Sequence, residues 1–313
     1  MSDAPDLVDP ELRPLLDMWP TLTLDSAMLA EIRTGGRPLA TPPVVANRVV
    51  KTEHRVPGPA GAPKVALTVY TPPGSGPFPC IYHIHGGGYV MGAAAPLEFR
   101  HRPLAEELGA VIVSVDYRLA PETAHPGPVE DCYAGLDWVI ANAATLDIDV
   151  ARLGVTGESA GGGLAAALAL LVRDRGDLVL TFQLLVYPMI DDRTVDAEPH
   201  PHVGQYIWTP ASNHFGWSAL LGHEPGIEGV SPYAAAARAD NLANLPPTFI
   251  MTGALDLFLE EDIDYARRLT RAGVPTELHV YPGAFHGFDI HPTAAVAVRA
   301  RADQTAAFKR FLT

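Results

Sequence analysis

The sequence has 313 residues, of which 48% are hydrophobic and 19% charged, and this is enough chain for one large α/β domain. A formal net charge of −14 disfavours binding to nucleic acid or to anionic membrane surfaces. The acidic first ten residues are unlike a secretory signal, and no run of about 18 apolar residues is present to span a bilayer. These features favour a cytoplasmic protein.

The cysteines indicate which disulfide and metal sites to expect. The two cysteines, Cys80 and Cys132, lie in apolar or helical contexts, so we expect two buried thiols, although the sequence leaves open whether they interact. Neither a Cys-x-x-Cys nor a His-Glu-x-x-His motif occurs, so no structural or catalytic metal such as zinc is expected.

The N-terminal part mixes helices with proline-rich breaks and then changes to strands. Helical patterns cover 10–18 and 26–34, and they predict an arm that packs on another part of the chain. The first strands are predicted over 44–50 and 65–70, with the Pro- and Gly-rich stretch 56–63 as a hairpin-type connection.

Apolar strands then alternate with helices. The predicted strands are 78–84, 111–115, 153–155, 178–187, 248–252 and 277–281, and the predicted helices are 129–141, 164–172, 259–271 and 293–311. Continuous apolar strands that alternate with helices predict an α/β fold with a mostly parallel sheet covered on both faces.

The stretch 191–226 interrupts this rhythm because it is loop-like and helical, with no clear strand. It contains Tyr206, Trp208, Phe215 and Trp217. An aromatic insertion between two sheet strands predicts a lid over the carboxyl edge of the sheet, and a helical surface insertion with its own small core explains it equally well.

The most informative motif is Gly157-x-Ser159-x-Gly161, between an apolar strand and an alanine-rich helix. A serine in such a sharp strand-to-helix turn is typical of a nucleophile elbow, where glycines avoid collisions with neighbouring turns. The alternative is a glycine-rich loop in which Ser159 caps a core helix.

Acyl transfer by a serine needs a base and an acid that orients it. His286 lies in a loop directly after a predicted strand, and Asp256 is the first carboxylate after the 248–252 strand. The rivals Glu260, Glu261 and Asp262 fall on the following helix, where a solvated N-terminal charge cluster is the ordinary explanation.

Main-chain donors for an oxyanion are predicted in His85-Gly86-Gly87-Gly88. The glycines allow the N–H groups of Gly87 and Gly88 to turn toward one point, and the N–H of Ala160 joins them from the elbow. A flexible loop is the alternative, and it is disfavoured by the elbow, acid and histidine in the same chain.

Taken together, these motifs resemble the hormone-sensitive-lipase-like family of bacterial carboxylesterases. The resemblance rests on 85–89 (HGGGY), 116–122 (DYRLAPE), 157–162 (GESAGG) and the loops of Asp256 and His286, and it runs from about residue 45 to the C-terminus. The order serine, aspartate, histidine is the α/β-hydrolase order. Two departures are Leu257, where many members have proline, and Glu158, where aspartate or threonine is frequent.

The resemblance implies an α/β-hydrolase core of 45–190 and 227–313, a helical cap of 1–44 and 191–226, and cofactor-free ester hydrolysis. It makes Ser159 the nucleophile, His286 the general base and then acid, and Asp256 its orienting residue, with 116–122 as a structural turn. The candidate lining of the substrate pocket is Tyr89, Glu158, Tyr187, Tyr206, Trp208, Phe215 and Phe288.

We therefore expect a carboxylesterase that acts on small, short-chain acyl esters. The alternatives are a specialised hydrolase, such as a lipase or an acetyl or lactone esterase, and a non-catalytic small-molecule receptor on the same fold. Receptors of this kind lack the catalytic histidine, whereas His286 is present here. The sequence leaves the oligomeric state open, and analogy alone suggests a homodimer.

Overall fold

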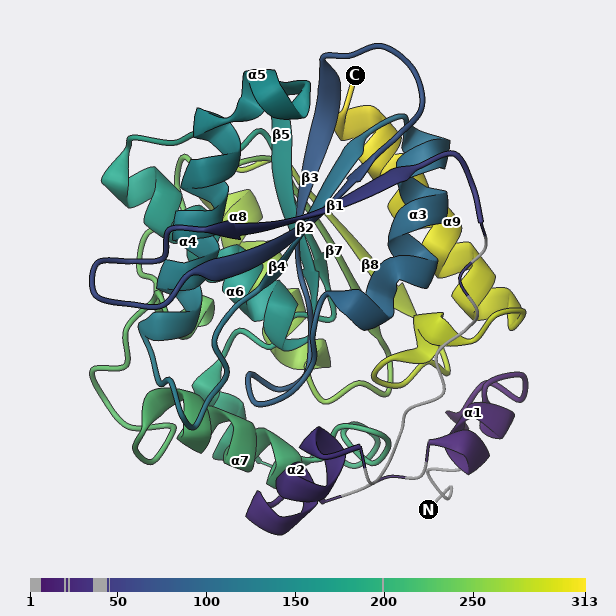
Figure 1. Ribbon diagram of the computed structural model, residues 1–313. Coiled ribbons are helices and arrows are strands. Elements are labelled where there is room, and N and C mark those ends of the chain that lie inside the picture. Colours follow the sequence, from purple (N-terminus) through teal and green to yellow (C-terminus); the bar gives the residue numbers. More distant parts are fainter. Residues whose placement is uncertain (1–6, 20, 22, 36–43, 45, 199) are drawn as a thin grey trace.

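The computed structural model describes residues 7–19, 21, 23–35, 44, 46–198 and 200–313. These residues form one eight-stranded sheet with strand order β1-β2-β4-β3-β5-β6-β7-β8 (Figure 1). β1 pairs antiparallel with β2, and β2 antiparallel with β4, whereas all the later neighbours are parallel. The strands are β1 (Val50–Val56), β2 (Val65–Thr71), β3 (Phe78–Ile84), β4 (Val111–Asp116), β5 (Ile148–Glu158), β6 (Gln183–Val186), β7 (Thr248–Gly253) and β8 (Thr276–Tyr281).

Helices cover both faces of the sheet, as the sequence predicts. The helices α4 (Gly127–Ala141), α6 (Ala160–Arg175) and α8 (Leu259–Arg271) lie on one face, and α3 (Glu98–Leu108) and α9 (Ala295–Phe311) lie on the other (Figure 1). The short α5 (Ala143–Leu146) leads into β5. The 3₁₀ turns are η2 (Ala95–Leu97), η3 (Asp192–Val195), η4 (Ala236–Arg238) and η5 (Phe288–Ile290).

Side-chain alternation explains why the central strands are apolar throughout. In β4, Val113 packs into the core that contains Leu136 and Leu168, whereas its neighbour Ile112 packs into the core that contains Phe308. Successive residues of a strand point to opposite faces, so a strand covered on both faces needs apolar residues at both positions.

The register brings four loops to one edge. Ile84 at the end of β3 pairs with Gly157 in β5, and Glu158 at the end of β5 pairs with Val186 in β6. Gly253 at the end of β7 pairs with Tyr281 at the end of β8. The loops after β3, β5, β7 and β8 therefore leave the sheet side by side, which is where parallel α/β sheets build their sites.

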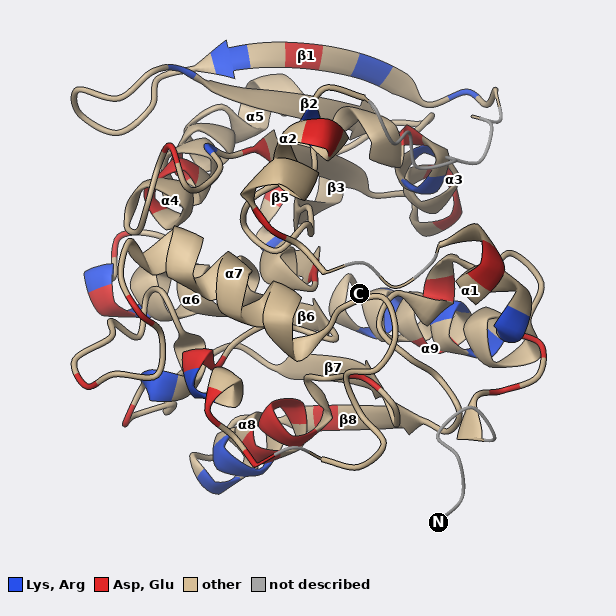
Figure 2. Ribbon diagram, turned by 90° about the horizontal axis from the view of Figure 1, so that it is seen from below, with Lys and Arg blue, Asp and Glu red and all other residues tan. Residues whose placement is uncertain are grey.

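Helices from two distant segments lie beyond this edge. They are α1 (Arg13–Met18) and α2 (Ser26–Arg33) from the N-terminal arm, and α7 (Pro210–Leu221) from the insertion (Figures 1 and 2). The backbone N–H of Leu24 donates to Ser212 Oγ at 3.0 Å, which joins the start of α2 to α7. The parts of the arm at 1–6 and 36–43 lie outside the described residues.

Two predictions of strand bounds are wrong, and one helix was not predicted. The strand predicted over 44–50 starts instead at Val50, because β1 is an edge strand with many polar, exposed residues and carries little apolar signal. The strand predicted over 178–187 spans only β6, since Tyr187 leaves the strand conformation at φ +34°. The helix α3 was not predicted, because it is rich in charge and holds Pro103 inside.

Two general expectations, on the cysteines and on membrane-spanning helices, can be compared directly with the structure. Cys80 and Cys132 are buried and form no disulfide, in agreement with the prediction of two buried thiols. Within the described part of the chain, no helix is both long and apolar enough to cross a membrane.

Candidate active site

Ser159 lies at a sharp turn between β5 and α6 and is 7% exposed. Its backbone has φ +57° and ψ −123°, which is strained for a residue with a side chain. A Cβ added at Gly161 would lie 2.1 Å from the carbonyl oxygen of Ile84, so the close approach of β3 requires glycine there. A hydrogen bond from the N–H of Ser159 to the carbonyl of Val186, at 2.9 Å, joins this turn to the end of β6.

His286 and Asp256 extend from Ser159 in a row. His286 Nε2 lies 2.9 Å from Ser159 Oγ, and His286 Nδ1 lies 2.9 Å from Asp256 Oδ2. With the carboxylate accepting from Nδ1–H, Nε2 carries no proton and can accept one from the serine hydroxyl. All three side chains are buried or nearly so, which strengthens these interactions by excluding water.

The loops that carry the acid and the histidine are joined to each other. The N–H of Leu255 donates to the carbonyl of Ala284 at 2.9 Å, and the N–H of Ala254 donates to that of Tyr281 at 2.9 Å. The second oxygen of Asp256 accepts from the N–H of Phe258 at 3.0 Å. The distance from Asp256 to the imidazole is therefore set by the backbone of two neighbouring loops.

Aromatic rings surround the imidazole of His286. The ring of Tyr187 meets it edge-on at 4.7 Å between centroids, that of Phe258 at 5.2 Å, and that of Trp208 lies at 6.4 Å. The sequence did not indicate Phe258, because its ring contacts that of His286 only in the folded chain. The rings limit the orientations open to the imidazole.

A buried polar chain supports Tyr187 from behind. Its hydroxyl donates to Asp289 Oδ1 at 2.6 Å, and Arg100 Nη2 donates to Asp289 Oδ2 at 2.7 Å. Asp289 is 1% exposed, so the guanidinium compensates a buried charge. Neither Asp289 nor Arg100 was a candidate from sequence, because α3 was not predicted and nothing local links residues 100 and 289.

The glycine loop after β3 passes directly against the elbow. A Cβ at Gly86 would lie 2.8 Å from the carbonyl oxygen of Glu158. Among the hydrogen bonds of the described residues, none uses the N–H groups of Gly87, Gly88 or Ala160. Unpaired N–H groups on a loop packed against the Ser159 turn are the type of donor that can stabilise an oxyanion.

Trp208 covers this loop from the insertion. A Cβ at Gly88, where φ is +58°, would lie 2.2 Å from Trp208 Cη2, and its three nearest atoms would all belong to that indole. The indole Nε1 donates to Asn213 Oδ1 at 3.2 Å, and Trp208 is 6% exposed. The insertion thus contacts both His286 and the glycine loop.

Glu158, next to the serine, points away from the hydroxyl. Its Oε2 lies 2.8 Å from His83 Nε2. Burial disfavours its charged form, but the charges of His83, Arg100 and His101 and the hydrogen bond from His83 outweigh burial and lower the pKa of Glu158 to about 2. Its carboxylate therefore anchors β5 to β3 beneath the elbow.

The rival carboxylates lie elsewhere. Glu260 is exposed, and Glu261 accepts hydrogen bonds from the N–H of Ile190 and the hydroxyl of Thr194. Burial raises the pKa of Glu261 and that of Asp262. In the described structure none of the three is hydrogen-bonded to His286.

The predicted pocket residues divide into two groups. Trp208 and Tyr187 lie against His286, and Tyr206 packs on Phe285, 5.7 Å away between ring centroids. Phe215 is partly buried on α7. Tyr89 and Phe288 are fully buried and Glu158 is paired with His83, so for these three a place in the pocket lining stays a prediction.

Among the described residues, no group of three or more His, Cys, Asp or Glu side chains converges on a possible metal position. The arrangement at Ser159 offers a nucleophile, a base with its partner and oxyanion donors from this chain's own groups.

Comparison with known proteins places this geometry in a family. A family model described as "alpha/beta hydrolase fold" matches residues 81–290. The chain is 36% identical to carboxylesterase NlhH of Mycobacterium tuberculosis, over 97% of this chain and 96% of that protein, and 35% identical to esterase LipI of the same organism, over 92% and 89%. A solved structure titled "Bacterial Heroin Esterase" superposes with a TM-score of 0.90 at 39% identity, over 98% of this chain and 99% of that one. The chain therefore belongs to the hormone-sensitive-lipase-like family of α/β-hydrolases, a family of carboxylic ester hydrolases.

Proposed function

We propose that this protein is a carboxylesterase that hydrolyses short-chain acyl esters through a Ser-His-Asp triad and an acyl-enzyme. The observation that carries the proposal is the row from Ser159 Oγ through His286 to Asp256, with both contacts at 2.9 Å. The names of relatives such as carboxylesterase NlhH and esterase LipI support the same reaction class.

In the first half of the reaction, Ser159 Oγ attacks the ester carbonyl carbon while His286 Nε2 takes the hydroxyl proton. The carbonyl oxygen becomes an oxyanion and accepts hydrogen bonds from the N–H groups of Gly87, Gly88 and Ala160. The C–O bond to the alcohol then breaks, and the alcohol leaves with the proton from His286.

In the second half, water attacks the acyl carbon of the serine ester and gives its proton to His286 Nε2. Collapse of this second oxyanion breaks the bond to Ser159 Oγ, which takes the proton back. The carboxylic acid leaves, and the triad is restored with no net change in the protein.

We expect a preference for short acyl chains because the site is covered. Ser159 is 7% exposed, and the indole of Trp208 is packed against Gly88. The described parts of the N-terminal arm and the insertion, α2 and α7, lie beyond the strand ends, and we propose that 1–44 and 191–226 act as a cap. A series of p-nitrophenyl esters is expected to peak between acetyl and about hexanoyl. A maximum at palmitoyl would overturn this preference.

The reaction is tested with Ser159→Ala and p-nitrophenyl butyrate. Ser218 offers a matched control, because its Oγ lies 3.4 Å from His214 Nδ1 and His214 Nε2 lies 2.5 Å from Glu224 Oε1. That exposed row has the same chemical groups, but it lies along α7 rather than on an elbow. We expect Ser159→Ala to lose hydrolysis while it stays folded and Ser218→Ala to keep it; retained turnover in Ser159→Ala would refute the assignment.

A further inference from the structure

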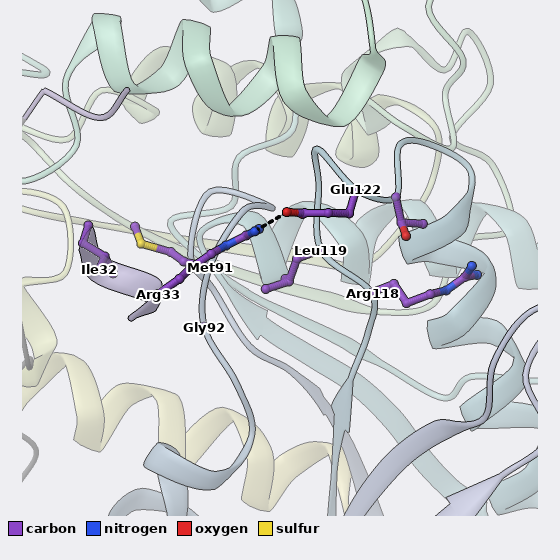
Figure 3. A pocket seen from close by; sticks show the side chains of 8 residues that line it. Ile32, Arg33, Met91, Gly92, Arg118, Leu119 and Glu122 are labelled. Atoms are coloured by element: carbon purple, nitrogen blue, oxygen red, sulfur yellow. Dashed lines mark hydrogen bonds and ion pairs between the residues drawn. The ribbon is translucent and has the colours of Figure 1, made fainter. Parts of the chain in front are cut away.

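One cation from the N-terminal arm is bound to the loop that carries the oxyanion donors. Arg33 is the last residue of α2. Its Nε and Nη2 donate to the carbonyl oxygen of Val90 at 2.8 and 2.6 Å, and Nη2 also donates to that of Ala120 at 2.7 Å. Its Nη1 donates to Glu122 Oε1 at 2.7 Å, the pair drawn in Figure 3.

Val90 closes the turn that holds the glycines. The N–H groups of Val90 and Met91 donate to the carbonyl of Gly87 at 3.1 and 3.0 Å, so this turn fixes the direction of the peptide groups at 87–88. Val90 itself is fully buried. The guanidinium therefore binds the outer end of the same turn that contains Gly87 and Gly88, the proposed oxyanion donors.

Ala120 belongs to a second loop that supports the first. Its N–H donates to the carbonyl of Tyr89 at 3.0 Å, which joins the 116–122 turn to the glycine loop. A planar guanidinium that binds the carbonyls of both loops fixes their separation in a way that a lysine ammonium does not. Arg33 lies at the junction of α2, the glycine loop and the 116–122 turn.

We propose that Arg33 is a positioning residue for the oxyanion donors, through which the N-terminal arm holds the glycine loop in its reactive geometry. This inference rests on the proposed ester hydrolysis. Arg33 acts through Val90 and does not touch the substrate, so its removal affects stabilisation of the oxyanion more than binding of the ester. The expected signature is a fall in kcat with little change in KM.

The surroundings of Arg33 make a chemical-rescue experiment possible. A pocket of about 520 Å³ opens beside the guanidinium, lined by Ile32, Arg33, Met91, Leu119, Glu122 and Thr123 among others (Figure 3). In Arg33→Ala, a free guanidinium ion can enter from this pocket and bind the two vacated carbonyls.

Arg33→Ala is expected to lower kcat on p-nitrophenyl butyrate by about 10- to 100-fold, less than the complete loss of one oxyanion donor. KM should change less than about threefold, because binding in the ground state is retained. Low millimolar guanidinium chloride should restore part of kcat, and the same concentration of sodium chloride should not. Arg33→Lys should fall between the wild type and Arg33→Ala.

Glu122→Ala is the matched control. It removes the carboxylate partner of Arg33 and leaves the three hydrogen bonds from Arg33 to carbonyls in place. The Glu122 side chain is 66% exposed. Its kcat should equal that of the wild type. A normal kcat in Arg33→Ala overturns the proposal. A loss of kcat that guanidinium fails to restore, and that is proportional to the fall in the unfolding midpoint, also overturns it.

The two proposals fail separately. If the wild type hydrolyses no ester, or if Ser159→Ala remains active, the proposed function is wrong. If the wild type is active and Ser159→Ala inactive, while Arg33→Ala keeps full kcat, only the role of Arg33 is wrong.

Discussion

Replacing Gly88 with alanine tests whether Trp208 and the glycine loop form one packed unit. Gly88 has φ +58°, and an alanine in this left-handed region costs about 1–2 kcal/mol. Its Cβ would also lie 2.2 Å from Trp208 Cη2, and overpacking of this kind costs about 1–3 kcal/mol. We expect a total loss of about 2–5 kcal/mol in stability, and a fall in kcat of about 10²–10³ as the loop moves.

A second substitution separates the two costs. Trp208→Leu removes the indole atoms nearest to the added Cβ but leaves the backbone conformation unchanged, so Gly88→Ala should cost about 1–3 kcal/mol less in that background. Gly109→Ala serves as the control, because its φ is +56° and a Cβ there would meet nothing within 4 Å. The assay is denaturant unfolding of the four proteins of the cycle, together with kcat. Additive effects of the two substitutions would refute the packed unit.

Three further outcomes follow from the geometry. Asp256→Asn is expected to lower kcat by about 10⁴-fold at neutral pH, because the amide favours the wrong tautomer of His286; a fall below tenfold would contradict this role. The pKa of Glu158 is lowered from 4.5 to about 2, which corresponds to about 3 kcal/mol of stability that is present above pH 5 and is lost as the pH falls toward 2. Glu158→Gln should therefore unfold more easily than the wild type at pH 7, with a difference that shrinks below pH 5, and a pH-independent difference would count against it. Tyr187→Phe leaves Asp289 without one buried donor and should cost about 1–3 kcal/mol in denaturant unfolding, whereas an unchanged midpoint would contradict the supporting chain.

The sequence allows most of the central sheet and the three loops of Ser159, Asp256 and His286 to be predicted, because these features are local. Strand β3 and helix α8 have the predicted bounds, since an apolar run between turn residues and an amphipathic helix leave a clear pattern. Ser159, Asp256 and His286 are predictable from their positions after strands, and the register brings them together.

What could not be predicted depends on contacts between distant residues. Arg33 binds Val90, 57 positions away, and its helical context looks like an ordinary exposed surface. Asp289 could not be identified because its partner, Arg100, lies on α3. The charged residues and internal proline of α3 obscure the helical pattern of apolar residues. Tyr89 and Phe288 are fully buried, and their place in the pocket lining stays a prediction, because sequence does not distinguish an aromatic ring at a site from one in the core.

The central claim is that Ser159 is the nucleophile, and covalent labelling tests it most directly. The wild-type protein is treated with diethyl p-nitrophenyl phosphate, which transfers one diethylphosphoryl group to an activated serine, and the labelled peptide is identified by mass spectrometry. We predict one label per chain, on Ser159, with hydrolysis of p-nitrophenyl butyrate lost in proportion to labelling and no labelling in Ser159→Ala. A label on another residue, or continued hydrolysis by fully labelled protein, would contradict the account.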